Sequence, residues 1–200
     1  DRQTGAVNWV DPGDLELAYR SSRLKRRSDE VVIRVSFRLN ADGLSQPIRY
    51  GELARTLGVE EDERAPAADV RAVVLALRAS KGMVLDPDDH DTWSAGSFFT
   101  NPLLEPAAAD ALPEDAPRWP TPDGRVKTSA AWLIDHAGFS KGFAVETGAP
   151  AGLSTKHVLA LTNRGGATGA DLARLRDAVV SGVRERYGVT LVPEPVAVGW

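Results

Sequence analysis

The sequence predicts an α+β fold, and three observations support this class. Residues 31–39 alternate apolar and polar side chains, which is the pattern of a half-buried strand. Residues 66–81 and 168–188 instead repeat apolar side chains at helical spacing. Strands and helices follow one another without the regular βαβ alternation of a parallel sheet, and no internal repeat is visible.

The composition is that of an ordinary globular chain. With 200 residues, 42% of them hydrophobic, the chain can bury a core as one domain or as two small ones. The net charge of -4 gives no overall attraction to nucleic acid or anionic lipid, and no run approaches the roughly 18 apolar residues of a membrane helix. The absence of cysteine excludes disulfides and zinc-thiolate sites and favours an intracellular protein. We therefore expect a soluble cytoplasmic protein without a nucleic-acid or membrane partner.

The first half of the chain passes from strand to helix. The expected strand at 31–39 follows a charged loop with Tyr19 at its base. After a polar turn at 40–43, residues 47–58 are typical of a short strand or turn followed by one or two helical turns. The helix at 66–81 has basic residues near its C-terminal end, where positive charge is favourable.

The middle of the chain is less regular. Residues 83–104 are rich in Asp, Gly and Pro, and the proline-studded stretch at 106–122 is expected to be a surface connection or a long functional loop. Residues 129–138 predict a short helix that ends at Gly138, and residues 157–163 predict a strand.

The last helix, at 168–188, has the clearest signals. Thr168 is placed to cap the amides near Asp171, and an apolar stripe runs along the helix to Gly188. A final strand is expected at 189–198, and its two prolines confine it to a sheet edge or a strand end.

Several polar motifs have a plain structural explanation. The glycine-rich run at 164–169 lacks the lysine of a P-loop and predicts a strand-to-helix turn. The acidic cluster at 86–91 has no glutamate at the twelfth position of a calcium loop and favours a solvated loop, so we expect no metal site. His136 alone is typical of a packing or surface residue, and an exposed loop explains the basic run of Arg23, Lys25, Arg26 and Arg27.

The segment AGSFFTNP at 95–102 is different in kind. Gly96 permits close backbone approach, Ser97 supplies a hydroxyl, two large rings follow, and Asn101 before a proline offers an amide in an extended geometry. By itself such a segment is more often an ordinary buried turn than a site.

Seven segments of the chain carry a resemblance to known proteins. They are YRSSRLK at 19–25, RASK at 78–81, AGSFFTNP at 95–102, AAWLID at 130–135, KG at 141–142, STKHVLALTN at 154–163 and ERYGVTLVPE at 185–194. In this order they resemble one enzyme family, the UDP-N-acetylenolpyruvoylglucosamine reductases, also called UDP-N-acetylmuramate dehydrogenases. The resemblance covers nearly the whole chain and is most specific at GSFF followed by NP and at the terminal PE.

The resemblance implies a flavin-dependent oxidoreductase of peptidoglycan precursor synthesis, with FAD and NADPH as cofactors. Reduced flavin would pass hydride to the enolpyruvyl group of a UDP-sugar, leaving an enolate-like carbon that needs a proton. Ser97 then corresponds to the general acid, which requires a positive environment to stabilise the alkoxide left behind. Glu194 corresponds to the family's second catalytic residue, which helps to stabilise the enolate.

Five further positions match residues that contact the UDP-sugar in the family. Tyr19 resembles a tyrosine on a loop that folds over the substrate, and Lys81 suits a diphosphate. Asn101 and His157 match contact positions, although a glutamine is also found in place of His157, and Lys141 is a further candidate for the same positive pocket.

Two departures from the family pattern put fine substrate and flavin contacts in doubt. Thr100 stands where a basic residue is common, and residues 195–198 lack the arginine that often follows the glutamate.

The family layout implies three domain pieces. Residues 1–82 would be the C-terminal part of the flavin-binding domain, 83–187 the α+β substrate-binding domain, and 188–200 a strand returning to the first domain. Because the chain opens abruptly at Asp1, we expect more sequence ahead of it, and we expect these 200 residues to be a monomer that is inactive alone. The alternative is a non-catalytic nucleotide-sugar binding module, against which the retention of Ser97 and Glu194 argues.

Overall fold

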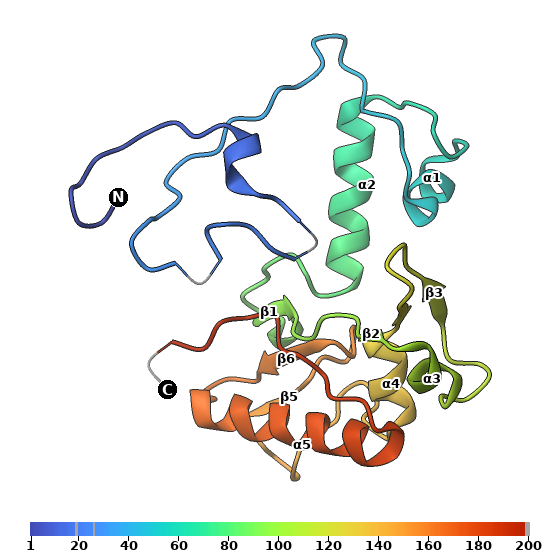
Figure 1. Cartoon of the computed structure of the whole chain (residues 1–200). Coiled ribbons are helices and arrows are strands. Elements are labelled where there is room, and N and C mark those ends of the chain that lie inside the picture. The colour runs from blue at the N-terminus through green and yellow to red at the C-terminus, as the bar shows by residue number, and fades with distance from the viewer. Residues whose placement is uncertain (19, 26, 199–200) are drawn as a thin grey trace. The chain divides into compact units, whose positions relative to one another are not determined.

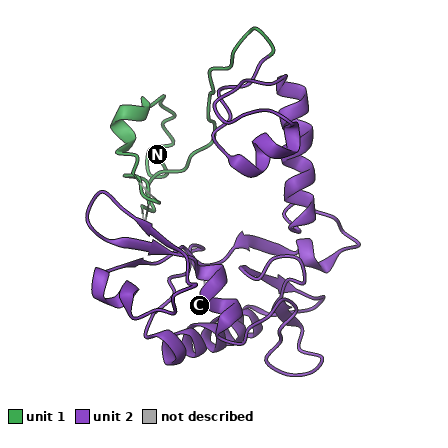
Figure 2. Ribbon diagram, turned by 90° about the vertical axis from the view of Figure 1, so that its right-hand side faces the viewer, with its two compact units in different colours: residues 1–43 green, residues 44–200 purple. Residues whose placement is uncertain are grey.

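The computed structural model describes residues 1–18, 20–25 and 27–198 and confirms the α+β class, with separate helices and small antiparallel sheets. The chain divides into two compact units, residues 1–43 and 44–200 (Figure 2). In the described part of the chain, none of the helices has the length and apolar character needed to cross a bilayer.

The first unit has little regular structure and none of its described residues is buried. It contains the 3-10 helix η1 (Pro12–Leu15) and ion pairs within its basic segment, where Arg23 binds Glu30 at 3.0 Å and Arg27 binds Asp29. Lys25 and Arg27 are exposed as predicted, whereas Arg23 is half-buried against Glu30. Tyr19 and Arg26 lie outside the described residues.

The predicted strand at 31–39 is wrong for this chain. The segment has no strand assignment, and its apolar side chains are exposed, with Phe37 81% and Leu39 83% accessible. A strand requires a neighbour to accept and donate its backbone hydrogen bonds, and no described segment pairs with these residues. The alternating pattern is present, but no segment in the described part of the chain covers it.

Helices α1 (Gly51–Leu57) and α2 (Ala67–Ser80) confirm the helical predictions for this part of the second unit. They pack on each other around a small cluster of Ile48, Ala54 and Ala65. Gly82, at φ +68°, follows α2 and lies against the next element, because a Cβ there would stand 2.9 Å from the carbonyl oxygen of Asp91. This close approach fixes the C-terminal end of α2 to the segment that leads into the first strand.

A three-stranded antiparallel sheet forms the centre of the second unit, in the order β1 (Ser94–Ser97), β6 (Ala160–Asn163) and β5 (Ala151–Leu153). The 3-10 helix η2 (His90–Thr92) leads directly into β1. Strand β6 begins three residues later than predicted, because residues 157–159 belong to the tight turn that enters it.

Helix α5 (Gly169–Tyr187) packs against β5 and β6 and supplies the centre of the main core (Figure 1). Leu175, Val179 and Val183 are fully buried on its apolar stripe. The predicted cap is confirmed: Asp171 N donates to Thr168 Oγ1 at 3.3 Å, and Thr168 N donates to Asp171 Oδ2 at 2.9 Å. The run at 164–169 is the predicted strand-to-helix turn.

Helix α4 (Ala130–His136) confirms the prediction at 129–138 and packs against α5. Ser129 caps it by accepting from Trp132 N at 3.1 Å, and Leu133 and Ile134 are fully buried. His136 is exposed and stacks on Trp132 with the ring centroids 4.0 Å apart, which agrees with the prediction of a packing or surface residue.

The proline-rich stretch is more ordered than predicted. It contains α3 (Pro106–Asp110) and β3 (Arg118–Pro120), and β3 pairs with β4 (Val126–Thr128), which also pairs with β2 (Leu103–Leu104). The Arg118 guanidinium holds the stretch by donating to five backbone carbonyls, those of Ala109, Leu112, Pro113, Glu114 and Ala116. The Arg118 side chain therefore orders residues 109–116, which lie outside the β-ladders.

The predicted last strand is also wrong. Residues 189–198 make a single antiparallel bridge, between Phe99 and Pro193. Proline has no backbone N–H, so Pro193 and Pro195 prevent the bridge from growing into a ladder. Val189 and Leu191 are nevertheless buried in the main core.

We predict that Thr168→Ala lowers the free energy of unfolding by about 1 kcal/mol, because the first amides of α5 lose their side-chain acceptor. Thr168→Ser keeps that acceptor and should retain most of the stability. Urea denaturation of the two variants measures the difference, and an equal loss in both would contradict the role of the cap.

Candidate functional site

The centre of the site is the hydroxyl of Ser97 at the end of β1. Its Oγ lies 3.3 Å from Nε2 of His157, sixty residues further along the chain. The pairing of β1 with β6 sets Ser97 opposite Ala160, and the turn that enters β6 brings His157 to it. The register of this pair shifts between Ser94 and Ser97, where Gly96 has φ +77°, and such a bulge re-aims the side chain that follows it.

The turn that carries His157 is closed by a buried serine. Ser154 Oγ accepts from Lys156 N at 3.0 Å and from His157 N at 3.2 Å, and Ala160 N donates to the His157 carbonyl at 3.0 Å. The Ser154 side chain has no solvent exposure. The backbone amides of Lys156 and His157 are therefore satisfied within the turn from which the imidazole extends.

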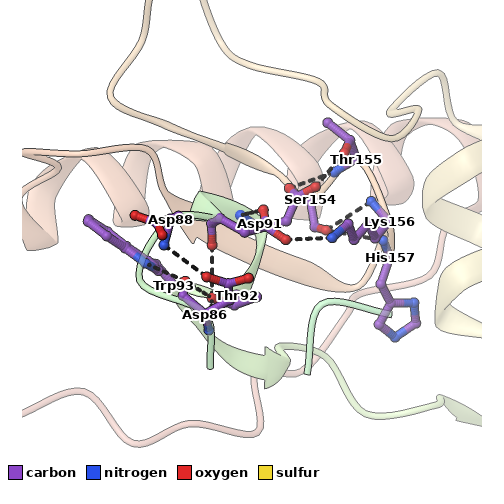
Figure 3. Close-up of polar contacts among 10 residues, drawn as sticks. Asp86, Asp88, Asp91, Thr92, Trp93, Ser154, Thr155, Lys156 and His157 are labelled. Atoms are coloured by element: carbon purple, nitrogen blue, oxygen red, sulfur yellow. Dashed lines mark hydrogen bonds and ion pairs between the residues drawn. The ribbon is translucent and has the colours of Figure 1, made fainter. Parts of the chain in front are cut away.

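The acidic cluster at 86–91 is solvated, as predicted, at Asp86 and Asp88, but Asp91 departs from that prediction. Asp91 is 8% exposed, and its Oδ1 accepts from Thr155 N at 2.9 Å while Oδ2 binds the Thr155 hydroxyl (Figure 3). Asp89 caps η2 by accepting from Asp91 N at 2.9 Å and pairs with Lys156. The carboxylates reach donors on a distant turn, which the local sequence does not reveal. Among the described residues, no group of three or more acidic or histidine side chains could hold a metal ion.

The imidazole of His157 sits in a half-buried and positive environment. Burial is the largest cause that lowers its pKa below the ordinary 6.5, and the charges of Lys81 and then Lys141 lower it further. Lys141 is brought to the turn because the following residue, Gly142, donates its N–H to the Ser154 carbonyl at 3.2 Å. The charges of two predicted residues thus reach the imidazole that contacts Ser97.

Lys81 is held by two residues that the sequence did not single out. Its Nζ lies 2.8 Å from Glu52 Oε2, and the Tyr50 hydroxyl donates to the same oxygen at 2.6 Å. The hydrogen bond to Glu52 raises the pKa of Lys81, and the hydrogen bond to Lys81 lowers the pKa of Glu52. Tyr50 and Glu52 stand at the start of α1, and no motif or spacing in the sequence connects them with Lys81.

Glu194 lies beside the Ser97 segment through backbone contacts. Its N–H donates to the Phe98 carbonyl at 2.8 Å, and Thr100 N donates to the Val192 carbonyl at 3.1 Å. Residues almost a hundred positions apart therefore run side by side, and the Glu194 side chain is partly buried. Thr100, the departure from the family pattern, also directs its hydroxyl to the Val192 carbonyl at 3.4 Å.

Asn101 has a structural contact of its own. Its Oδ1 accepts from Ala130 N at 3.0 Å, which satisfies one of the unpaired amides at the start of α4. The amide nitrogen of Asn101 makes no described hydrogen bond and is available for the predicted contact with substrate. Tyr19, the remaining predicted residue, lies outside the described part of the chain.

The arrangement suits proton delivery to an anionic ligand. A hydroxyl in contact with an imidazole can give up its proton more readily when nearby cations stabilise the oxyanion that remains. Lys81 and Lys141 supply such cations, and ammonium groups also bind phosphate oxygens.

We predict that an NMR titration of the His157 imidazole gives a pKa below 6.5 and that Lys81→Met raises it, because one nearby positive charge is removed. Lys141→Met should raise it by a smaller amount. Lys127→Met, which removes a cation that contacts Trp119 instead, is the matched control and should leave the His157 pKa unchanged.

We also predict that Asn101→Ala costs about 1 kcal/mol of unfolding free energy, since the Ala130 amide loses its acceptor, while Asn101→Asp keeps an acceptor and retains the stability. Thermal and urea denaturation decide between the variants. Full stability in Asn101→Ala would rule out this capping contact as a stabilising interaction.

Comparisons with known proteins agree on one family. A family model described as UDP-N-acetylenolpyruvoylglucosamine reductase, C-terminal domain, matches residues 86–198. The chain is 60% identical to UDP-N-acetylenolpyruvoylglucosamine reductase of Cutibacterium acnes, a match that covers all of this chain and 52% of that protein. It is 55% identical to the Streptomyces coelicolor protein of the same name, covering 100% of this chain and 54% of that one.

Among solved structures, the crystal structure of UDP-N-acetylenolpyruvylglucosamine reductase from Thermus caldophilus matches with 25% identity and a TM-score of 0.35, covering 67% of this chain and 37% of that chain. The chain spans about half the length of the curated relatives that it matches. Because the family model covers more than half of the chain, the chain belongs to the UDP-N-acetylenolpyruvoylglucosamine reductase family.

Proposed function

We propose that this chain is the C-terminal part of an enzyme that reduces UDP-N-acetylglucosamine enolpyruvate to UDP-N-acetylmuramate in peptidoglycan precursor synthesis. The observation that carries the proposal is the contact of Ser97 with His157, 3.3 Å long, inside the segment that the family model matches. FAD and NADPH are the proposed cofactors of the intact enzyme, and a UDP-sugar is its ligand.

The hollow beside β1 is lined by apolar side chains such as Leu85, Trp93 and Phe98, and none of the described residues that line it is a cation that could bind a flavin diphosphate. Since the chain spans about half the length of its relatives, we place FAD and NADPH mainly on protein outside these 200 residues. Bound flavin would supply the hydride, and this chain would supply the proton.

In this proposal Ser97 donates its proton to the substrate carbon that carries the developing negative charge. The His157 ring holds the hydroxyl in place, and the positive field of Lys81 and Lys141 stabilises the alkoxide. The Glu194 N–H donates a hydrogen bond to the carbonyl of Phe98, the residue after Ser97. In this proposal the Glu194 side chain helps to stabilise the enolate. The contribution of one positioned proton donor is on the order of a hundred- to ten-thousandfold in rate.

The substrate would be held by the predicted contact residues. Lys81 and Lys141 suit the diphosphate, and the Asn101 amide nitrogen would donate to the UDP-sugar while its oxygen caps α4. Tyr19 is proposed to lie on a loop over the substrate, and His157 to contact substrate as well as Ser97.

We further propose a division into residues 1–82, 83–187 and 188–200. The small cluster under α1 and α2 is separate from the main core, which supports a boundary near residue 82. The absence of cysteine suits a reducing compartment, so we place the enzyme in the cytoplasm, as a monomer.

We predict that Ser97→Ala in the full-length protein lowers turnover of the enolpyruvyl UDP-sugar by at least about a hundredfold while substrate affinity is kept, because only the proton donor is lost. Steady-state NADPH oxidation and ligand titration measure the two quantities. Ser181→Ala, an exposed serine on α5, is the control for the same substitution. Unchanged turnover in Ser97→Ala would refute the assignment of Ser97 as the proton donor, whereas a wild-type protein that binds the UDP-sugar without reducing it would favour a non-catalytic nucleotide-sugar binding module.

A further inference from the structure

We propose that Asp91 is a positioning residue for Ser97: by binding Thr155, it holds the turn of residues 154–157 so that the His157 ring stays at the serine hydroxyl. This inference rests on the proposed function of Ser97 as the proton donor. Asp91 itself touches neither Ser97 nor His157 in any described hydrogen bond, so it would act through the turn.

The environment of Asp91 sets it apart from the other carboxylates of its loop. Asp86 and Asp88 are exposed, whereas Asp91 is 8% exposed and both of its oxygens are engaged by Thr155. A buried carboxylate is costly unless it is hydrogen-bonded, and hydrogen bonds to a charged group are stronger than neutral ones. The contact joins residues 64 positions apart, so it connects η2 with the turn of residues 154–157.

The location of the contact explains what it fastens. Helix η2 runs directly into β1, so the segment from Asp91 to Ser97 is attached to the 154–160 segment at two points. Asp91 binds Thr155 at one end, and Ser97 pairs with Ala160 at the other. His157 lies between these two attachments, and its side chain extends from the turn away from Asp91 (Figure 3).

The other contacts of the turn cannot replace this one. Ser154 closes the turn on its own backbone and makes no hydrogen bond to η2 in the described structure. The Asp89–Lys156 ion pair does reach η2, but both side chains are partly solvated, 28% and 40% exposed, and such pairs contribute about 0–1 kcal/mol. Asp91 is therefore the firm attachment of the turn to η2.

A kinetic cycle in the full-length protein tests the inference. Asp91→Asn should lower kcat for the enolpyruvyl UDP-sugar about tenfold, because small displacements of a catalytic group are costly, with the KM for NADPH within about twofold. Asp88→Asn, the same change at an exposed position of the same loop, should leave kcat unchanged.

The decisive comparison is made in the His157→Ala background. If Asp91 acts through His157, Asp91→Asn should cause no further loss once the ring is gone. An equal tenfold loss in both backgrounds would overturn the proposal, because a general structural defect does not depend on His157.

An NMR titration of His157 in the same protein gives a readout that does not require activity. Removal of a negative charge at Asp91 would by itself lower the pKa of the imidazole, so a rise toward 6.5 in Asp91→Asn reports loss of the buried, lysine-flanked position. An unchanged or lower pKa would overturn the proposal. If the wild-type protein lacks reductase activity, the proposed function fails, and this titration still decides whether Asp91 positions the ring.

Thr155 supplies a second pair of variants in case Asp91→Asn does not fold. Thr155→Val removes the hydroxyl that binds Asp91 and should raise the His157 pKa and lower kcat, while Thr155→Ser restores both. Identical behaviour of the Val and Ser variants would contradict the attachment.

Discussion

The antiparallel pairing of β1 with β6 is the interaction on which the rest of the site depends. It sets Ser97 opposite Ala160, and the bulge at Gly96 re-aims the serine toward the turn that carries His157. The same sheet is covered by the buried stripe of α5, so the core that stabilises the fold also fixes the position of the hydroxyl. Close-packed interiors transmit small displacements to the residues they contact. A catalytic side chain is therefore held most accurately on a regular strand that belongs to a well-packed sheet.

Cations and carboxylates have different contacts near Ser97. The charges of Lys81 and Lys141 lower the pKa of the His157 imidazole. The carboxylates instead bind residues that support the site, because Glu52 binds Lys81 and Asp91 binds Thr155. Neither carboxylate has a described hydrogen bond to the Ser97 hydroxyl. A positive potential is what an anionic ligand and a developing oxyanion both require.

The first 43 residues show the limit of local pattern. The alternation at 31–39 is as regular as that of any half-buried strand, yet the side chains are exposed, and none of the described residues before Gly43 is buried. A period-two pattern indicates which face of a strand would be buried. It does not supply the neighbouring strand, which must provide the donor or the acceptor of every inter-strand hydrogen bond. Exposed apolar side chains such as Phe37 are the physical sign of that unmet pairing.

The sequence by itself determined the helices with strong local signals. Thr168 with Asp171 and the apolar periodicity of α2 and α5 act within a few residues, so their effect is visible in one dimension. Motif resemblance also singled out Ser97, Asn101 and His157. Tertiary structure alone decided that His157 meets Ser97, that Asn101 caps α4, that Asp91 is buried on Thr155, and that Glu52 holds Lys81. Each of these contacts joins residues about 30 to 64 positions apart, and their energies depend on burial and distance, which no local pattern encodes.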